Sequence, residues 1–368
     1  MEKLSNRERI LTVLRGEVPD HVPWFGDLSY WHYAQCRRGT MPEKYQGNGL
    51  CDLHRELGVG FYLQGYWPFR AVYDGMTVED TTQGDDTLQR VVTPLGELTS
   101  LNKYIPDSYC WGPVEHLVKT ADDLPAFRYM LEHTRYEPDY AEAERRFELV
   151  GDNGIVLCYL PRSPLMEMVT TYAGIETLVY IRAEDPDGFA QTMELLETRH
   201  NEAAALALAS PAESLMIPEN LSSEVVGKRL YEEYMRPYEE RWIARVQKAG
   251  KYSFVHMDGT LQGLLREVAS AGFTVLEALT PAPAGDMALS DIRGLTGPAP
   301  VIWGGLPGMY FTPLVSDEEF ERFIIEAMEI MSAGPGYVLG VADQVPPDGI
   351  WERIRRVEEL VKKFGWYR

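Results

Sequence analysis

Two hydrophobic patterns take turns along this chain of 368 residues. Short apolar runs bounded by Gly, Pro, Asn or Asp are typical of buried strands. The longer stretches between them have the apolar spacing of amphipathic helices. The first helix is predicted over Asn6–Leu14, with Ser5 or Asn6 as its N-cap. The chain therefore starts with a helix and continues as alternating strands and helices.

The remaining elements repeat this alternation. Strands are predicted at 147–160, 214–217, 252–256, 274–279, 301–303 and 337–341. Helices are predicted at 176–181, 185–209, 227–249, 260–271, 316–333 and 349–364. Strict alternation indicates parallel βαβ units, and this many units with short joints favour a closed (β/α)8 TIM-like barrel over an open sheet. We therefore expect one α/β domain over residues 1–368.

The segment 78–140 departs from the alternation. Short alternating runs around Gly84 and Pro94 predict a β-ribbon, and an acidic stretch containing proline follows it. We interpret this segment as an insertion on one loop of the barrel, near the barrel mouth.

The charge of the chain limits its partners. A net charge of −21 and a pI of about 4.8 argue against nucleic acid and anionic membranes, because phosphate binding needs a basic surface. The N-terminus lacks the apolar core of a signal peptide, and no stretch approaches the roughly 20 apolar residues of a membrane span. The four cysteines form no CxxC pair. We expect a cytoplasmic protein, and a homodimer is left open.

Five side chains fall at the ends of predicted strands. In a barrel, strand ends and the loops after them carry the chemistry. His256 and Asp258 end one strand at i and i+2, which would place both side chains on one side of an extended backbone. Glu219, Glu277 and Asp343 end three others. Each carboxylate alone is consistent with a helix cap or an ion pair, but crowding at one barrel end would require a cation, a proton or a polar substrate.

The segments around the first predicted turns are rich in aromatic residues. Core packing explains many such clusters, but Trp and Tyr close to loops also suit a flat or apolar ligand. Asp27 lies among them. With Glu277, the predicted substrate-binding residues are Trp24, Phe25, Tyr30, Trp31 and Tyr66.

Several segments together resemble the uroporphyrinogen decarboxylase superfamily. They are NRERILTVLRGEVPDHVP, PLMEMVTTYAGIETLVYIRAEDPDGF, YEEYMRPYEER, HMDG and GYVLGVADQVPPDGIWERI, in that order along most of the chain. The superfamily also contains cobalamin-dependent methyltransferases, and the resemblance implies a (β/α) barrel. The decarboxylases carry an RQAGR motif after the first strand, whereas this chain reads FGDLSYWHYAQCRRG there. The chain therefore resembles the methyltransferase branch more than the true decarboxylases.

The resemblance also implies a metal site. The methyltransferases bind zinc through a His-x-Cys motif and a later Cys. His256 matches the His, while Asp258 and Asp343 take the places of the two Cys. With Glu219 added, these residues would hold a divalent metal, with zinc expected. A centre with carboxylate ligands is a stronger Lewis acid than one with thiolates, which suits cleavage of an ether.

The expected activity is methyl transfer from a small donor, with a methoxylated aromatic favoured, as in the zinc O-demethylases of this branch. The acceptor would be a corrinoid carried by a separate protein, because the DxHxxG signature of a cobalamin module is absent from the sequence. His256, Asp258, Glu219 and Asp27 are the predicted catalytic residues.

Two alternatives stay open. One is a decarboxylase-type lyase that acts on a small carboxylic acid without metal, through Asp27 or Asp258. The other is a non-catalytic binding relative in which His256 and the carboxylates form a hydrogen-bonded network.

Overall fold

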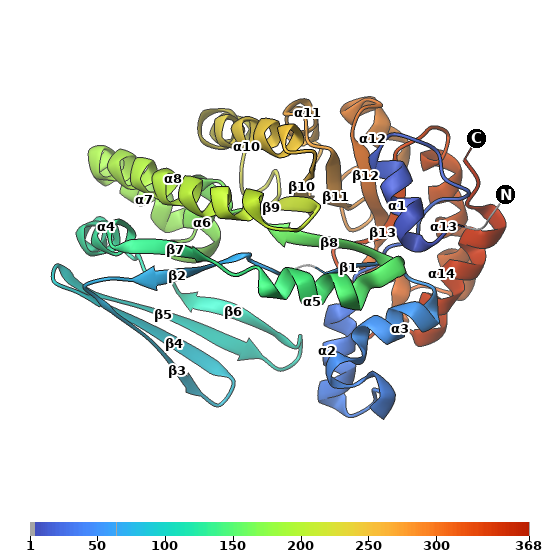
Figure 1. Ribbon diagram of the computed structural model, residues 1–368, viewed down its shortest axis with the longest axis horizontal. Coiled ribbons are helices and arrows are strands. Elements are labelled where there is room, and N and C mark those ends of the chain that lie inside the picture. Colours follow the sequence, from blue (N-terminus) through green and yellow to red (C-terminus); the bar gives the residue numbers. More distant parts are fainter. Residues whose placement is uncertain (1–3, 64, 368) are drawn as a thin grey trace.

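A parallel sheet of seven strands forms the centre of the computed structural model, which describes residues 4–63 and 65–367 (Figure 1). Its strand order is β1-β8-β9-β10-β11-β12-β13. The strands are β1 (Phe61–Leu63), β8 (Gly154–Tyr159), β9 (Ser214–Leu221), β10 (Tyr252–Met257), β11 (Val275–Leu279), β12 (Val301–Pro307) and β13 (Tyr337–Ala342).

A short extended segment at Trp24 closes this sheet into a barrel. Trp24 forms a parallel bridge with Leu339 of β13, and Phe25 N donates to Leu339 O at 2.9 Å. On its other side, Trp24 O accepts from Gly60 N, next to β1, at 2.8 Å. The segment thus takes the eighth strand position, between the last strand and the first. The predicted (β/α)8 barrel is confirmed.

The barrel interior is packed with side chains from alternate strand positions. Phe254 of β10 belongs to the interior cluster with Tyr62 and Trp303, whereas Val255 belongs to the cluster under the surrounding helices. Because alternate residues of a strand point to opposite faces, His256 shares the inward face of Phe254, one step nearer the strand end. Helix α1 (Asn6–Leu14) packs into the same interior cluster through Ile10.

Helices surround the barrel on its outer side (Figure 1). Those that follow or precede the barrel strands are α3 (Leu50–Leu57), α5 (Ala141–Val150), α6 (Pro164–Glu167), α7 (Ile175–Glu184), α8 (Pro186–Ala209), α9 (Lys228–Leu230), α10 (Arg236–Lys248), α11 (Leu265–Ser270), α12 (Leu289–Thr296), α13 (Asp317–Met331) and α14 (Trp351–Phe364). Two π-helical turns, η5 (Met168–Tyr172) and η6 (Tyr231–Met235), continue α6 and α9. Short 3-10 turns are η1 (Glu43–Tyr45), η2 (Gly47–Gly49), η3 (Ala121–Asp123), η4 (Gly151–Asn153) and η7 (Gly308–Phe311).

Some predicted elements need correction. The strand predicted at 147–160 begins as the end of α5 and becomes β8 only at Gly154. Its first part follows AEAERR, whose Ala, Glu and Arg favour helix, and Gly151 breaks that helix with a φ of 52°. Helix α12 was not predicted, and α11 is shorter than expected. The capping prediction at Ser5 is confirmed, because Ser5 and Glu8 form a capping box.

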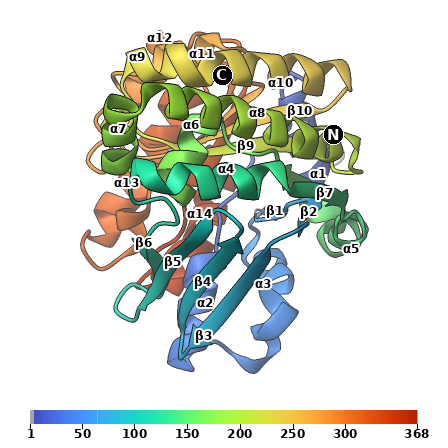
Figure 2. The ribbon, with the colours of Figure 1, turned by 90° about the vertical axis from the view of Figure 1, so that its left-hand side faces the viewer.

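The insertion contains more strands than a single ribbon. Its four-stranded antiparallel sheet comprises β3 (Thr77–Gln83), β4 (Asp86–Thr93), β5 (Gly96–Ile105) and β6 (Cys110–Glu115). A separate antiparallel pair, β2 (Phe69–Tyr73) with β7 (Thr134–Pro138), lies between that sheet and the barrel, and α4 (Leu124–Glu132) contacts both β5 and α8 (Figures 1 and 2).

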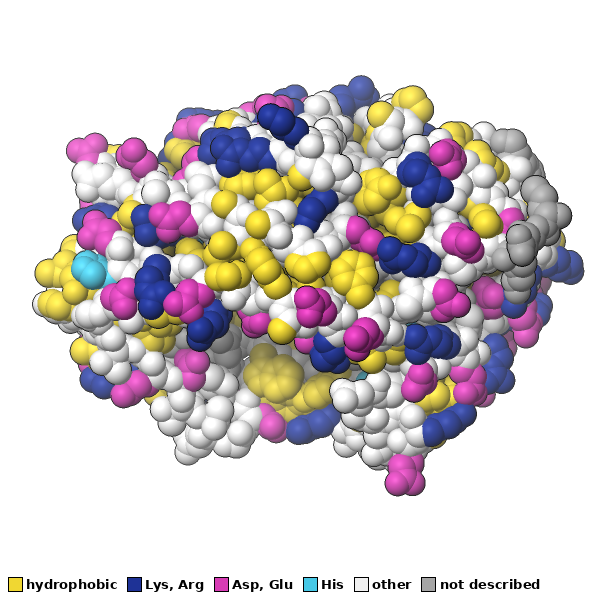
Figure 3. Space-filling view, in the orientation of Figure 1, with side chains coloured by type: hydrophobic (Ala, Val, Ile, Leu, Met, Phe, Trp, Pro, Cys, Tyr) yellow, Lys and Arg dark blue, Asp and Glu magenta, His cyan; other side chains and the backbone are white. Residues whose placement is uncertain are grey.

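Helix α2 (Ser29–Arg38) holds the insertion sheet beside the barrel mouth. Arg37 pairs with Asp85 at 2.9 Å, and Tyr30 donates to the carbonyl of Ser108. Figure 3 shows a hollow on this face between the insertion sheet and the α2–α3 segment, with hydrophobic side chains inside it. Over the described part of the chain, no helix combines the length and the apolar character needed to cross a membrane.

Candidate functional site

A histidine–carboxylate pair lies at the carboxyl ends of β10 and β11. His256 and Glu277 are register partners in these neighbouring parallel strands, so their side chains emerge side by side from the inward face. His256 Nδ1 lies 2.5 Å from Glu277 Oε2, and the Tyr62 hydroxyl donates to Glu277 Oε1 at 2.9 Å. Because the carboxylate accepts at Nδ1, Nε2 of His256 is left toward the barrel mouth.

The surroundings of His256 keep its ring protonated. Burial alone disfavours the charged imidazolium, and the side chain is only 8% exposed. The charge and hydrogen bond of Glu277 outweigh that penalty, and Asp343 and Asp258 add to them. Together they raise the pKa of His256 to about 9. At neutral pH the pair is therefore an imidazolium held by a carboxylate, with Nε2 carrying a proton that can be donated.

Asp343 faces the open side of this histidine. Its Oδ1 lies 3.8 Å from His256 Nε2, and about half of its side chain is exposed at 52%. Loss of hydration raises the pKa of Asp343 to about 6, against the attraction of His256. Its φ is 67°, and Ala278 within β11 and Asn220 within β9 have similar left-handed values of 63° and 52°. Strained backbone of this kind is common at functional sites.

Asp27 lines a small cavity of about 200 Å³ at the barrel mouth. Asp27 accepts from Ser29 N at 2.7 Å, and Gln344 Nε2 lies 3.4 Å from its other oxygen. Burial raises the pKa of Asp27, and Glu277 adds to this shift. Tyr62 and Tyr159 form other parts of the cavity wall. The prediction placed Asp27 among catalytic residues, and the structure brings it beside the His256–Glu277 pair.

Glu219 belongs to a different network. Its carboxylate is fully buried and accepts from Ser163 N at 2.9 Å and from Ser163 Oγ at 3.1 Å. Burial raises its pKa, although the bonds from Ser163 oppose the shift. Glu219 therefore braces the loop after β8, and the expected contribution to the His256 cluster is not observed.

The predicted aromatic substrate residues divide into core and mouth positions. Trp24 packs on Phe311, and Trp31 packs on Trp351 while donating to Gly349 O. Both are 2% exposed, so the structure places them in the core and not at the barrel mouth.

The remaining three predicted aromatic residues, Phe25, Tyr66 and Tyr30, also differ in their positions. Phe25 is buried in the barrel interior against Trp303, and the Tyr66 hydroxyl donates to Asp139 O at 2.5 Å. Tyr30 is the one that reaches the mouth, where the carboxylate of Asp343 contributes to raising its pKa after burial. Glu277, predicted to bind substrate, instead holds His256.

Three residues of the mouth were not predicted as site residues. Tyr62 donates to Glu277, and Tyr159 and Gln344 line the cavity. Tyr159 ends β8 and Gln344 follows β13 by two residues, so strand-end position was the signal that would have found them.

The ligand set expected for a divalent metal is not assembled. A catalytic zinc takes three protein ligands. Across residues 4–63 and 65–367, no three His, Cys, Asp or Glu side chains are gathered to hold an ion. Glu219 is bound to Ser163, and Nδ1 of His256 is taken by Glu277, which leaves His256 Nε2 and Asp343 as a facing pair. These residues do not fit the expected metal centre.

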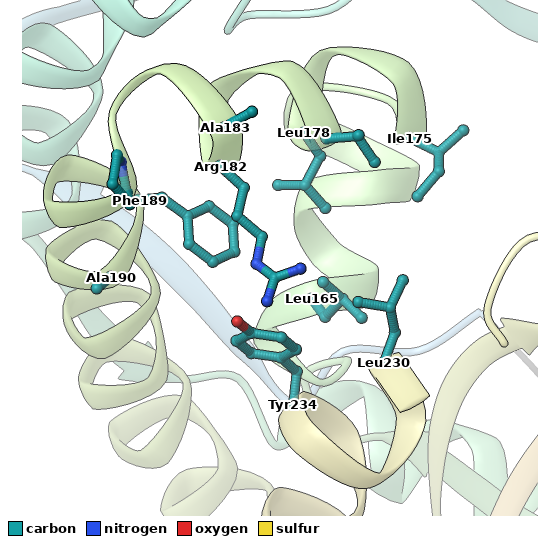
Figure 4. Close-up of a pocket in the computed structure, with 11 residues that line it drawn as sticks. Leu165, Ile175, Leu178, Arg182, Ala183, Phe189, Ala190, Leu230 and Tyr234 are labelled. Atoms are coloured by element: carbon teal, nitrogen blue, oxygen red, sulfur yellow. The ribbon is translucent and has the colours of Figure 1, made fainter. Parts of the chain in front are cut away.

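A cavity of about 560 Å³ lies away from this cluster. It is lined by residues of α6, α7, α8, α9 and the η6 turn. Figure 4 shows the guanidinium of Arg182 pointing toward the hydroxyl of Tyr234, with Leu165, Leu178 and Leu230 around them. Its lining contains no histidine or carboxylate, so its size does not make it the reaction site.

Comparison with known proteins places the chain in a family. Residues 155–364, more than half of the chain, match the family described as Uroporphyrinogen decarboxylase (URO-D). No curated protein sequence gives a significant match. A methyltransferase from Methanosarcina mazei superposes with a TM-score of 0.63 at 14% identity, over 98% of this chain and 99% of that one.

A B12-independent methionine synthase from Shewanella sp. W3-18-1 gives a TM-score of 0.46 at 9% identity, over 94% of this chain and 95% of that one. At 14% identity, the likeness to the Methanosarcina mazei methyltransferase concerns the fold alone. The family match, which spans β8 to α14 and includes His256, Glu277 and Asp343, is the decisive result. The chain belongs to the uroporphyrinogen decarboxylase (URO-D) family.

Proposed function

We propose that this URO-D family member is an enzyme of methyl transfer, in which His256 protonates the leaving group of a small methyl donor. The acceptor is a corrinoid carried by a separate protein, which acts as a co-substrate. The observation that carries the proposal is the 2.5 Å pair of His256 and Glu277, whose open Nε2 faces Asp343 at the barrel mouth. The shared fold with the Methanosarcina mazei methyltransferase also supports methyl transfer.

A methoxylated aromatic is the donor that suits this acid best. In the reaction, the methyl–oxygen bond of the donor breaks, the methyl group passes to the nucleophilic corrinoid, and the Nε2 proton goes to the departing oxygen. A phenol has an ordinary pKa of about 10. An imidazolium with a pKa of about 9 can therefore deliver its proton to a phenolate with little energetic penalty.

The carboxylates of the mouth restrict the donor further. Asp27, Asp258, Glu277 and Asp343 lie around His256, so an anionic substrate would meet repulsion. A neutral ether meets none. This charge balance also opposes a multiply acidic tetrapyrrole.

The test is a methyl-transfer assay with reduced corrinoid protein and a panel of methoxylated aromatics. We expect the wild type to release the phenol and His256→Gln to lose about 10²- to 10⁴-fold in kcat, the usual contribution of a general acid. His116→Gln is the matched control, because His116 lies on the loop after β6 and bonds Thr171 O. Equal rates for wild type and His256→Gln would rule out this role.

A second candidate is a lyase that decarboxylates a small carboxylic acid without metal. The buried Asp27 carboxyl in the mouth cavity, with its raised pKa, favours it as a proton donor or electrostatic partner. The two reactions differ in their requirement for the corrinoid protein. Release of CO2 that proceeds without that protein, and is lost in Asp27→Asn, would select the lyase.

A further inference from the structure

A second cavity, of about 190 Å³, is lined in part by aromatic rings. It lies between the β2–β7 pair and the barrel side formed by η5 and α8. Its volume is below the range of about 300 Å³ and above that is usual for drug-sized ligands, so an occupant must be small. We call it the cage, and its five rings are those of Trp67, Phe69, Tyr73, Tyr136 and Tyr172.

Three rings of the cage contact one another in sequence. Trp67 and Phe69 lie with centroids 5.7 Å apart at 63°, and Phe69 and Tyr136 lie 5.5 Å apart at 80°. Aromatic rings usually fill the space between themselves when they serve only as core. Here they leave a cavity, and Tyr73 is 41% exposed at its edge. The cage is therefore a pocket that opens to solvent beside Tyr73.

One carboxylate lines the cage. Glu167 contributes a carboxylate whose side chain is 12% exposed. Arg162 Nη1 lies 3.6 Å from that carboxylate, so the two side chains form an ion pair that is too long for a hydrogen bond. No lysine or arginine is among the described residues that line the cavity.

Two other basic groups face the cage from neighbouring elements, and both have partners. Arg199 Nη2 pairs with Glu202 at 2.9 Å. His200 Nδ1 donates to Arg162 O at 2.9 Å, and burial lowers the pKa of His200, which keeps the ring neutral. The electrostatic potential inside the cage is therefore set by the ring faces and by Glu167 together with its ion-pair partner Arg162.

We propose that the cage binds a small organic cation with a methylated ammonium group. The negative faces of aromatic rings attract such a cation, and its methyl groups pack on the rings without needing hydrogen-bond partners. Glu167 supplies the opposite charge. A primary ammonium would instead require several acceptors, which the ring faces do not provide. The inference goes beyond the proposed methyl transfer and does not depend on it.

Calorimetry on the full-length protein, without any corrinoid protein, tests the cage directly. Choline and tetramethylammonium are the probes, and 3,3-dimethyl-1-butanol is the uncharged analogue of choline with the same shape. We expect choline to bind at least about tenfold more tightly than the alcohol, from the cation–ring and carboxylate attractions together. Similar affinities for choline and the alcohol, or no binding of either cation, would overturn the proposal.

Variants locate the binding within the cage. Glu167→Gln and Trp67→Leu should each weaken choline binding by about tenfold, and circular dichroism checks that each variant is folded. Trp111→Leu is the control, because Trp111 is 48% exposed on the insertion sheet, outside the cage. If Trp67→Leu does not fold, Glu167→Gln alone decides. Unchanged choline affinity in the folded variants means that the cation binds elsewhere and refutes the cage.

Discussion

At the scale of single residues, the site depends on which partner each polar group has. His256 lies in β10 and Asp343 directly follows β13, and neither position is unusual in sequence. What distinguishes them is Glu277, which is fully buried, accepts from Tyr62 and holds Nδ1 of His256. A buried carboxylate that is already paired fixes both the orientation and the charge of the imidazole. Glu277, which does not itself face the mouth, therefore controls the protonation of His256 Nε2.

Replacing Glu277 by Gln should shift the pH dependence of the reaction. The folded pKa of His256 is raised above its ordinary 6.5, so the pair stabilises the fold fully below pH 6.5 and loses that effect as pH rises through about 9. The same proton is needed for catalysis, so kcat/KM should fall along the same alkaline limb. In Glu277→Gln that limb should move down by more than about one pH unit.

Measurement of kcat/KM against pH, with an NMR titration of the imidazole, would show this shift. Tyr62→Phe is the matched control, because it removes a hydrogen bond to Glu277 and keeps the carboxylate. Its limb should stay close to 9. An alkaline limb that does not move in Glu277→Gln would show that Glu277 does not control the proton.

At the scale of elements, α1 contributes to the packing of the barrel interior, whereas the strand ends carry the site. Ile10 of α1 is fully buried and joins the interior cluster with Phe254 and Trp303, whereas His256 occupies the strand end beyond Phe254. Stability and chemistry therefore use different layers of one interior. Such a division is usual in (β/α) barrels, where the strand carboxyl ends carry the site.

Ile10→Ala should lower the free energy of unfolding by about 2–5 kcal/mol, the usual range for truncating a buried aliphatic side chain. Its kcat at 25 °C should stay within about twofold of wild type, because it leaves the His256–Glu277 pair intact. Urea titration and the methyl-transfer assay measure the two quantities. Arg15→Ala, at an exposed position of the same segment, should change stability by no more than about 0.5 kcal/mol. A large loss of kcat in folded Ile10→Ala would contradict the separation.

The sequence was sufficient for the barrel and for part of the site. Regular alternation predicted β9 to β13 because each is a short apolar run between clear turns. It failed at α5, where a helix and a strand are joined by Gly151 within one apolar stretch. His256, Asp27 and Asp343 were predicted and lie near one another. Glu219 and Trp24 were misplaced because sequence position does not reveal the direction of a side chain that leaves a strand end.

At the scale of the whole molecule, acidity and enclosure act together. The chain carries a net charge of −21, and several of its carboxylates surround His256 at the barrel mouth, beside the insertion sheet. A cation or a neutral molecule enters such a field more readily than an anion. The insertion sheet and α2 thus restrict access to the site, and the carboxylates around His256 select which molecules enter it.

The purified protein should retain no stoichiometric zinc, because the described residues provide a facing pair and no third ligand. Metal analysis after dialysis should give well under one zinc per chain, and a chelator should leave methyl transfer unchanged. His256→Ala provides the comparison. One zinc per wild-type chain that disappears in this variant would restore the metal centre.

The short extended segment at Trp24 has a mechanical consequence. The other members of the barrel are strands, whereas this one is an isolated bridge to Leu339, and Asp27 follows two residues after Phe25. The backbone of Asp27 is itself bonded to the loop after β13, because Val345 N donates to Asp27 O at 3.0 Å. Asp343 lies in that same loop. A shift of the end of β13 would therefore move both carboxylates together relative to His256, which Glu277 holds on the neighbouring strands.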